Sequence, residues 1–442
     1  MKTSAFRWFL CFLLFLATAL CFFDRQVLSV LSPTICEEFR MSDQDYSYVT
    51  NGFLIAYAGM FFLGGLLIDR LGTRWGLGLS VLVWTVASGL HSVIRTPFQM
   101  GASRFLLGMG EGGCFPGAAK AASEWFRPKE RALAVGIAIG GASLGGLAAP
   151  PMTLWLNQHF GWRGAFAATG LMGLLWCVLW FLFYHHPARS PWISSETREM
   201  LTATPSASNS EKENRCEISN KIQKNSVNES SSPKKPELPL RSLTAAVIGL
   251  AFARFLFDPI FYFYMFWIPK YLQEVCGAPD SIIRLTGIPF IAMGVTNIIG
   301  GFCSDLLVRR GFSALRSRKI IMILAALVTL ASSFVPLFKG QPIVALILMS
   351  TLMFGHGFWI TNFCALISDN FPQNRVATVM GISGLVGTIG GLCGNTAIGW
   401  VVGNYSYTPI WLVSGLLYPA ALLLILLTFR AKKGIAGETL AD

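Results

Sequence analysis

Charged side chains inside apolar stretches are the residues of this sequence best placed to do chemistry. Residues 101–117 are apolar and rich in glycine, yet they contain Arg104 and Glu111. Seven residues are almost two helical turns, so the two side chains project from about the same face, roughly 10 Å apart along the axis. A charge at membrane depth costs at least ~2.5–3.5 kcal/mol and must face a protein or water-filled interior. The stretch is predicted to form one wall of an anion-binding cavity; the alternative is an Arg–Glu pair that only joins two helices.

Asp24 and Arg25 lie side by side in another apolar stretch. A guanidinium group binds carboxylates through paired hydrogen bonds. A substrate carboxylate and a protein carboxylate can therefore compete for the same arginine. If protonation of Glu111 releases Arg104, proton binding favours anion binding, which would couple the two. The alternative is that these charges form permanent structural salt bridges.

The elements that must position these residues are membrane-spanning helices. The chain has 442 residues, of which 53% are hydrophobic and 13% charged, and a mean hydropathy of +0.54. Apolar runs of about 20 residues, long enough to span ~30 Å of hydrocarbon, recur along it. They lie at residues 8–30, 46–68, 76–94, 98–123, 132–156, 164–184, 243–268, 285–307, 319–338, 342–368, 376–402 and 408–429. The sequence predicts an all-α integral membrane protein with twelve transmembrane helices, embedded in a lipid bilayer.

The net charge of +12 is explained by topology and does not indicate nucleic-acid binding. If the N-terminus is inside, most Lys and Arg fall in the inner loops and tails. The outer loops hold only Arg40, Arg95, Arg163, Lys270, Arg284 and Lys339. This asymmetry follows the positive-inside rule and predicts that both termini are cytoplasmic.

Four segments are predicted along the chain. Residues 1–186 form an N-terminal six-helix half, and residues 242–430 form a C-terminal one. Residues 187–241 are rich in Ser, Asn, Lys and Pro, a composition that cannot bury enough apolar surface to fold, so a flexible cytoplasmic linker is expected there. Residues 431–442 form a cytoplasmic tail.

The two halves repeat each other. Phe23-Asp24 corresponds to Phe257-Asp258 at an offset of 234, and Gly110-Glu111-Gly112 corresponds to Gly355-His356-Gly357 at an offset of 245. Two such halves around a site near the midplane are typical of transporters that work by alternating access.

A second repeated motif follows the second and eighth spans. It consists of Gly65, Asp69, Arg70, Gly72 and Arg74 in the first half and of Asp305 in the second. The glycine permits close packing, the aspartate can attract a helix N-terminus, and the arginines hold the loop in the cytoplasm. Because the motif occurs twice at matching places, it is predicted to act in gating; the alternative is a topology signal with a tight turn.

The second half carries further polar candidates. His356 corresponds to Glu111 and titrates in the right range for proton coupling, although a lone buried histidine also serves as a packing residue. Arg254 and Asp258 are one turn apart and are expected to pair, with a substrate role as the alternative. Trp359 and Asn362 could meet the faces and hydroxyl groups of a sugar.

Beside these residues the sequence resembles a known family. The twelve spans and the two Asp-containing loops resemble the major facilitator superfamily. Residues 22–33, Arg104 to Glu111 and residues 124–134 resemble its anion:cation symporters, and residues 258–271 and 362–372 resemble hexuronate transporters in particular. The resemblance covers nearly the whole chain outside 187–241.

The resemblance implies roles for individual residues. The arginines matching Arg25 and Arg104 grip the substrate carboxylate, the acids matching Asp24 and Glu111 carry the coupling protons, and the tyrosine matching Tyr57 lines the cavity. The family usually has Asn-Tyr shortly before this Asp-Arg pair, where this chain has Cys21-Phe22. The glutamine of the fifth helix of galactonate carriers is also missing, since Gly141 or Ala142 falls there.

The sequence therefore predicts a proton-coupled importer of a sugar-acid anion, a hexuronate, acting as a monomer in a bacterial inner membrane without a cofactor. Alternatives on the same scaffold are a symporter or exchanger of an aldonate, sialate, dicarboxylate or organophosphate. A membrane sensor would need a folded output domain, which the sequence does not offer. No nucleophile–base pair, metal cluster or nucleotide loop indicates an enzyme.

Overall fold

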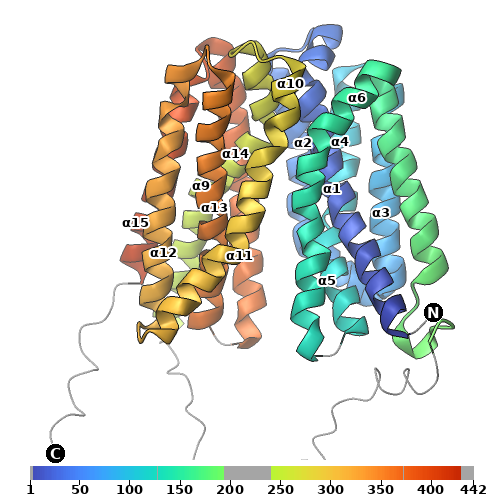
Figure 1. Ribbon diagram of the computed structural model, residues 1–442, viewed down its shortest axis with the longest axis vertical. Helices are drawn as coiled ribbons and strands as arrows, with labels where there is room; N and C mark the ends of the chain where they lie inside the picture. The colour runs from blue at the N-terminus through green and yellow to red at the C-terminus, as the bar shows by residue number, and fades with distance from the viewer. Residues whose placement is uncertain (1–2, 127, 194–239, 372, 430–442) are drawn as a thin grey trace, which may run out of the picture.

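The computed structural model describes residues 3–126, 128–193, 240–371 and 373–429, which are helical almost throughout and contain no strand. The helices stand side by side in two groups, one from each half of the chain (Figure 1). The predicted all-α membrane architecture in two halves is confirmed. Most of the predicted linker, residues 194–239, and the predicted tail, residues 431–442, lie outside the described residues.

The helix bounds follow the apolar runs. The first half contains α1 (Thr3–Phe39), α2 (Asp43–Leu71), α3 (Thr73–Leu90), α4 (Pro97–Glu111), α5 (Cys114–Trp125) and α6 (Pro128–Phe183). The second half contains α9 (Leu240–Glu274), α10 (Asp280–Ile283), α11 (Ile288–Arg309), α12 (Ala314–Thr329), the 3-10 segment η4 (Leu330–Phe338), α13 (Pro342–Asn370), α14 (Gln373–Asn404) and α15 (Thr408–Thr428). Helix α9 begins at Leu240, two residues before the predicted start of the C-terminal half at residue 242.

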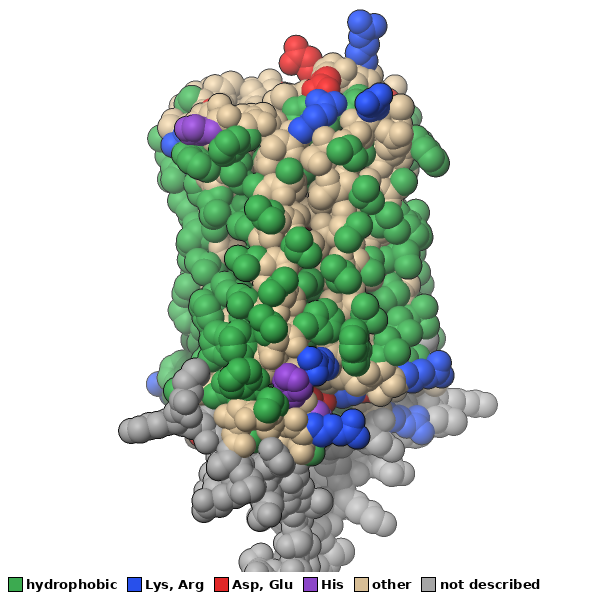
Figure 2. Space-filling model, turned by 90° about the vertical axis from the view of Figure 1, so that its right-hand side faces the viewer, with side chains coloured by type: hydrophobic (Ala, Val, Ile, Leu, Met, Phe, Trp, Pro, Cys, Tyr) green, Lys and Arg blue, Asp and Glu red, His purple; other side chains and the backbone are tan. Residues whose placement is uncertain are grey.

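Nine helices in the described ranges are long and apolar enough to cross a membrane, or ten if α2, bent by 55°, counts as one span. Each of the twelve predicted runs nevertheless lies on helix. Helix α6 carries two runs separated by Gly161, whose φ of 69° breaks the helical path, and α4 with α5 carries one. Figure 2 shows hydrophobic side chains covering the middle of one face, with charged side chains at its two ends.

Glycines before the end of α4 allow this helix to pack closely against its neighbours. A Cβ on Gly110 would lie 2.5 Å from the backbone nitrogen of Trp84, and one on Gly108 would lie 2.4 Å from the carbonyl oxygen of Phe53. Helices α2 and α3 therefore approach α4 more closely than a side chain allows. Glu111, the last residue of α4, is held in the centre of the first half.

We call the end of the bundle where α1 begins the inner end, because the charge distribution predicts that it faces the cytoplasm. The two groups of helices converge at the opposite, outer end (Figure 1). Among the described residues, every hydrogen bond between the halves joins residues in the middle or outer part of their helices. The structure thus has a closed outer end.

Candidate anion-binding and proton-transfer site

A buried ion pair joins α1 to α4. Arg25 Nε donates to Glu111 Oε2 at 2.5 Å, and the two side chains are 3% and 0% exposed. The Cys21 thiol, one turn before Arg25, donates to the same carboxylate oxygen at 3.4 Å. The other oxygen, Oε1, is buried without a hydrogen-bond partner among the described residues. Glu111 therefore contacts Arg25 and not Arg104, the partner that the sequence-based coupling hypothesis gave it.

Aromatic rings enclose the Arg25 guanidinium. It lies 4.5 Å from the ring centre of Tyr57, 5.0 Å from Phe22 and 5.1 Å from Phe53. Ring faces attract a cation without neutralising it. Tyr57, which the family resemblance predicts to line the cavity, stacks on Arg25 in this way, and its contact with a substrate stays a prediction. Arg25 thus keeps its charge and its hydrogen-bonding capacity, and it could bind an anion when its ion pair with Glu111 is broken.

Asp24 points away from Arg25, into the first half. Its Oδ1 accepts a hydrogen bond from Ser88 on α3 at 2.9 Å, and Ser88 in turn lies 2.7 Å from the hydroxyl of Thr169 on α6. Asp24 is 3% exposed and forms no ion pair within 4 Å in the described part of the chain. A hydroxyl group can donate a hydrogen bond to a carboxylate or accept one from a carboxylic acid, so this environment suits either protonation state of Asp24.

Arg104 is a buried cation with free hydrogen-bonding capacity. It is 2% exposed, and its one hydrogen bond is from Nη1 to the backbone oxygen of Asp24 at 3.4 Å. Its Nε and Nη2 have no acceptor in the structure as described. A buried guanidinium with unfilled donors is strongly unfavourable unless an anion completes it. His91, not anticipated from the sequence, stacks on Phe166, the same ring that Arg104 faces at 5.8 Å.

In the second half the expected local pair forms. Arg254 Nε donates to Asp258 Oδ2 at 3.0 Å, one turn along α9. His356 of α13 contacts another helix of the second half: its Nδ1 lies 2.6 Å from the hydroxyl of Tyr418 on α15. Its ring also stacks on Phe261 at 5.2 Å. His356 therefore belongs to an aromatic cluster inside the second half.

Asn362 and Trp359, proposed for sugar contacts, lie inside the second half on α13. The Asn362 amide donates to the backbone oxygens of Gly300 and Phe358, at 3.2 and 2.9 Å. Trp359 packs edge-on against Phe257, and both Trp359 and Asn362 are fully buried. The structure does not bring these two residues to the arginines of the first half, and their substrate role stays a prediction.

The first gating motif lies at the inner end, where α2 turns into α3. Gly72 has a φ of 75°, which suits glycine, and it caps both helices. Asp69 is exposed and pairs at 2.6 Å with Lys120 on α5, which is not among the residues predicted from the sequence to have a role. Arg74 donates to the backbone oxygen of Phe181 at 2.6 Å. Gly65, Asp69 and Lys120 line a pocket of about 410 Å³, while Arg70 is exposed.

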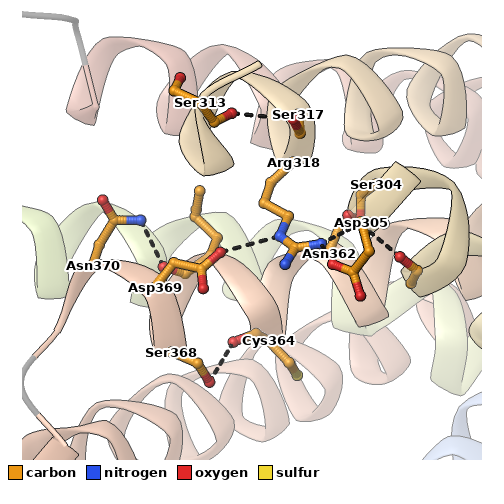
Figure 3. A network of polar contacts seen from close by, with 12 residues as sticks. Ser304, Asp305, Ser313, Ser317, Arg318, Asn362, Cys364, Ser368, Asp369 and Asn370 are labelled. Atoms are coloured by element: carbon orange, nitrogen blue, oxygen red, sulfur yellow. Dashed lines mark hydrogen bonds and ion pairs between the residues drawn. The ribbon is translucent and has the colours of Figure 1, made fainter. Parts of the chain in front are cut away.

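The second copy of the motif is more strongly paired. Figure 3 shows Arg318 of α12 between two acids, Asp305 at the end of α11 and Asp369 at the end of α13. The distances are 2.7 Å to Asp305 and 3.1 Å to Asp369, and Arg318 also donates to Ser304. Three helix ends of the second half are thus tied together at the inner end.

Residues that the sequence did not single out close the outer end, which we call the outer closure. Asn395 of α14 lies within hydrogen-bond distance of Ser47, Thr50 and Asn51 on α2. Lys270 of α9 pairs with Asp43 of α2 at 2.6 Å and with Glu274 of its own helix. A polar residue inside an apolar helix is the only sequence signal for these contacts, and it does not reveal the partner.

The residues described contain no group of three His, Cys, Asp or Glu that could hold a metal ion. Their chemistry is that of two buried arginines, two buried acids and hydroxyl groups, which suits binding of an anion together with movement of a proton.

Comparison with protein families decides the class of the molecule. The model of the Major Facilitator Superfamily matches residues 14–395. The chain belongs to this superfamily. It is a multi-pass membrane transporter and not an enzyme.

Several characterised relatives cover nearly the same length. The chain is 28% identical to the hexuronate transporter of Escherichia coli K12 over 93% of this chain and 91% of the relative. It is 28% identical to the galacturonate transporter of Dickeya chrysanthemi over 78% and 95%. It is 25% identical to the D-galactonate transporter of Escherichia coli O6:H1 strain CFT073 over 96% and 94%.

Solved structures support the same fold. The xylose transporter XylE from Escherichia coli, in an inward open conformation, aligns with a TM-score of 0.70 over 97% of both chains at 17% identity. A bacterial homolog to the human lysosomal transporter Spinster aligns with a TM-score of 0.67 at 17% identity over 96% of this chain and 95% of the homolog. At these identities the likeness concerns the fold alone.

Proposed function

We propose that this protein is a proton-coupled importer of a hexuronate that works by alternating access in a bacterial inner membrane. The observation that carries the proposal is the state of the two buried arginines. Arg104 has donors without acceptors, and Arg25 is bound to an acid that can be protonated. In a transporter related to sugar-acid carriers, a substrate carboxylate is the anion that fits.

Proton coupling would act through the Arg25–Glu111 pair. Protonation of Glu111 removes its negative charge, and Arg25 is then free to bind a substrate carboxylate near Arg104. Without the anion, proton loss restores the observed ion pair. Proton and anion thus bind together, as symport requires. Asp24, held by Ser88, is the second proposed proton carrier.

Alternating access would rest on the two ends of the bundle. The outer closure would have to separate before the site could open outward. The Asp69 and Asp305 motifs at the inner end would rearrange in the opposite phase of the cycle. Rocking of one half against the other around a central site is the general mode of such transporters.

Uptake of labelled glucuronate into proteoliposomes, with and without an inward proton gradient, tests the proposal. Wild-type protein should concentrate glucuronate only with the gradient. Arg104→Ala should abolish uptake, whereas Arg95→Ala, an exposed arginine of the outer loop, should not. No uptake of glucuronate or galacturonate by folded wild-type protein would refute the hexuronate assignment.

A second variant separates coupling from binding. Glu111→Gln removes the titratable group and keeps the size of the side chain. It should still exchange internal for external glucuronate but should no longer accumulate it against a gradient. Glu37→Gln, an exposed acid of α1, is the matched control. Gradient-driven accumulation by Glu111→Gln would refute the role of Glu111.

Another sugar acid on the same site is the alternative. Relatives that include D-galactonate and probable galactarate/D-glucarate transporters favour testing these acids in the same assay. Saturable proton-driven uptake of one of them in place of glucuronate would keep the anion site and change the substrate. We further propose that the protein acts as a monomer. We also propose that both termini lie in the cytoplasm, a topology that the charge asymmetry supports.

A further inference from the structure

Gln26, the residue after Arg25, is buried with an unused hydrogen-bond donor. The residue is 2% exposed, and its amide nitrogen Nε2 has no acceptor among the described residues. Buried amide groups in folded proteins are nearly always paired, because an unpaired one has given up its bonds to water. An unpaired amide beside an anion-binding arginine therefore calls for a functional explanation.

The amide lies where the two halves of the molecule meet. A Cβ built on Gly146 of α6 would be 3.1 Å from Gln26 Nε2 and 3.0 Å from the Cβ of Phe290 on α11. Gly287, the residue just before α11, also approaches α6 closely, because its Cβ would lie 2.6 Å from the Cα of Leu147. Gln26 is thus covered by the contact between α6 of the first half and α11 of the second.

The direction of Gln26 also differs from that of its neighbours. Successive helical residues are about 100° apart, so Gln26 projects roughly opposite to Asp24. Asp24 faces Ser88 inside the first half, whereas Gln26 faces the second half. Ser29, on a similar face one turn later, donates to the backbone oxygen of Phe266 across the same interface. Arg25 projects between these two directions, about 100° from Gln26, so a ligand bound to Arg25 that extends toward the second half would approach Gln26.

We propose that Gln26 recognises a hydroxyl group of the transported sugar acid. Its amide becomes accessible when α6 and α11 separate, and it then donates to a hydroxyl oxygen of the anion held by Arg25. This inference rests on the proposed function and adds to it a residue that selects polyhydroxylated carboxylates. A site group that loses its partner hydroxyl discriminates strongly against the analogue without it.

The test combines a variant with substrate analogues. Gln26→Met keeps nearly the same volume and removes the donor. The KM for glucuronate and for its 2-, 3- and 4-deoxy analogues is measured by proteoliposome uptake with wild type and variant. For wild type, one deoxy analogue should have a KM about tenfold higher than glucuronate, the value of one hydrogen bond. Gln26→Met should raise the KM for glucuronate about tenfold and should no longer distinguish that analogue from glucuronate.

Ser29→Ala controls for effects on the interface itself, because it removes an inter-half hydrogen bond, the one from Ser29 to the backbone oxygen of Phe266. It should change the KM for all four substrates by one common factor. The same uniform change in Gln26→Met, or an unchanged KM for glucuronate, would overturn the role of Gln26 and leave the proposed function standing. If wild-type protein transports none of the four, the inference is overturned, and the proposed function fails with it only if galacturonate is not transported either.

Discussion

Replacing Asn395 by leucine should open the outer end of the molecule. Three acceptors on α2 surround the Asn395 amide nitrogen: Ser47 O at 3.0 Å, Thr50 Oγ1 at 2.8 Å and Asn51 Oδ1 at 2.7 Å. An amide has two N–H groups, so at most two of these bonds form at once. Leucine has a similar size and no donor, so both inter-half bonds are lost.

The magnitude follows from those two bonds. A hydrogen bond contributes about 0.5–1.5 kcal/mol net, so the closed outer end should lose about 1–3 kcal/mol. Asn395 Oδ1 also accepts from Trp267 Nε1 at 2.7 Å, but both residues belong to the second half. Losing that bond therefore destabilises the closed and open states by the same free energy and does not shift the equilibrium between them. The population of outward-open molecules should therefore rise about 5- to 150-fold.

Electron–electron distance measurements between spin labels can detect the change. Labels introduced as non-natural amino acids at Val93 and Leu337 report on the two halves, since both side chains are exposed near the outer end. The variant should gain a population at altered distance. Asn404→Leu is the control, because Asn404 lies on the same helix and donates only to Trp400 O of that helix. Identical distance distributions for wild type and both variants would refute the role of Asn395 in the outer closure.

Three further changes test other parts of the structure. Lys270→Gln should shift the same distance distribution, because it breaks the inter-half pair with Asp43, while Lys339→Gln on the exposed outer loop should not. Arg318→Gln should lower the free energy of unfolding by only about 1–2 kcal/mol, because the two acids that Arg318 pairs with are partly exposed and screened by solvent. An unchanged melting temperature would contradict a stabilising role for these two ion pairs. Gly108→Ala should lower the melting temperature by an amount equivalent to about 1–3 kcal/mol, because its Cβ would strike the Phe53 carbonyl. Gly136→Ala, with nothing within 4 Å, should be neutral or stabilising, and equal behaviour of the two glycine variants would argue against the close contact of α2 with α4.

The sequence by itself determined the helices and the residues of the site. A bilayer requires apolar runs of a certain length, so the spans were readable from composition alone. Buried charges are costly there, which singled out Asp24, Arg25, Arg104 and Glu111. The Arg254–Asp258 pair was also predictable, because residues four apart on one helix are neighbours in any packing.

Only the tertiary structure decided which of these groups contact each other. Glu111 is seven residues from Arg104 on the same helix but pairs with Arg25, because the packing of the first half brings Arg25 of α1 to the end of α4. His356 finds Tyr418 on α15. The partners of Asn395 come from a helix more than 300 positions away in the chain. Such pairings depend on how distant helices cross, and helix periodicity carries no information about the crossing.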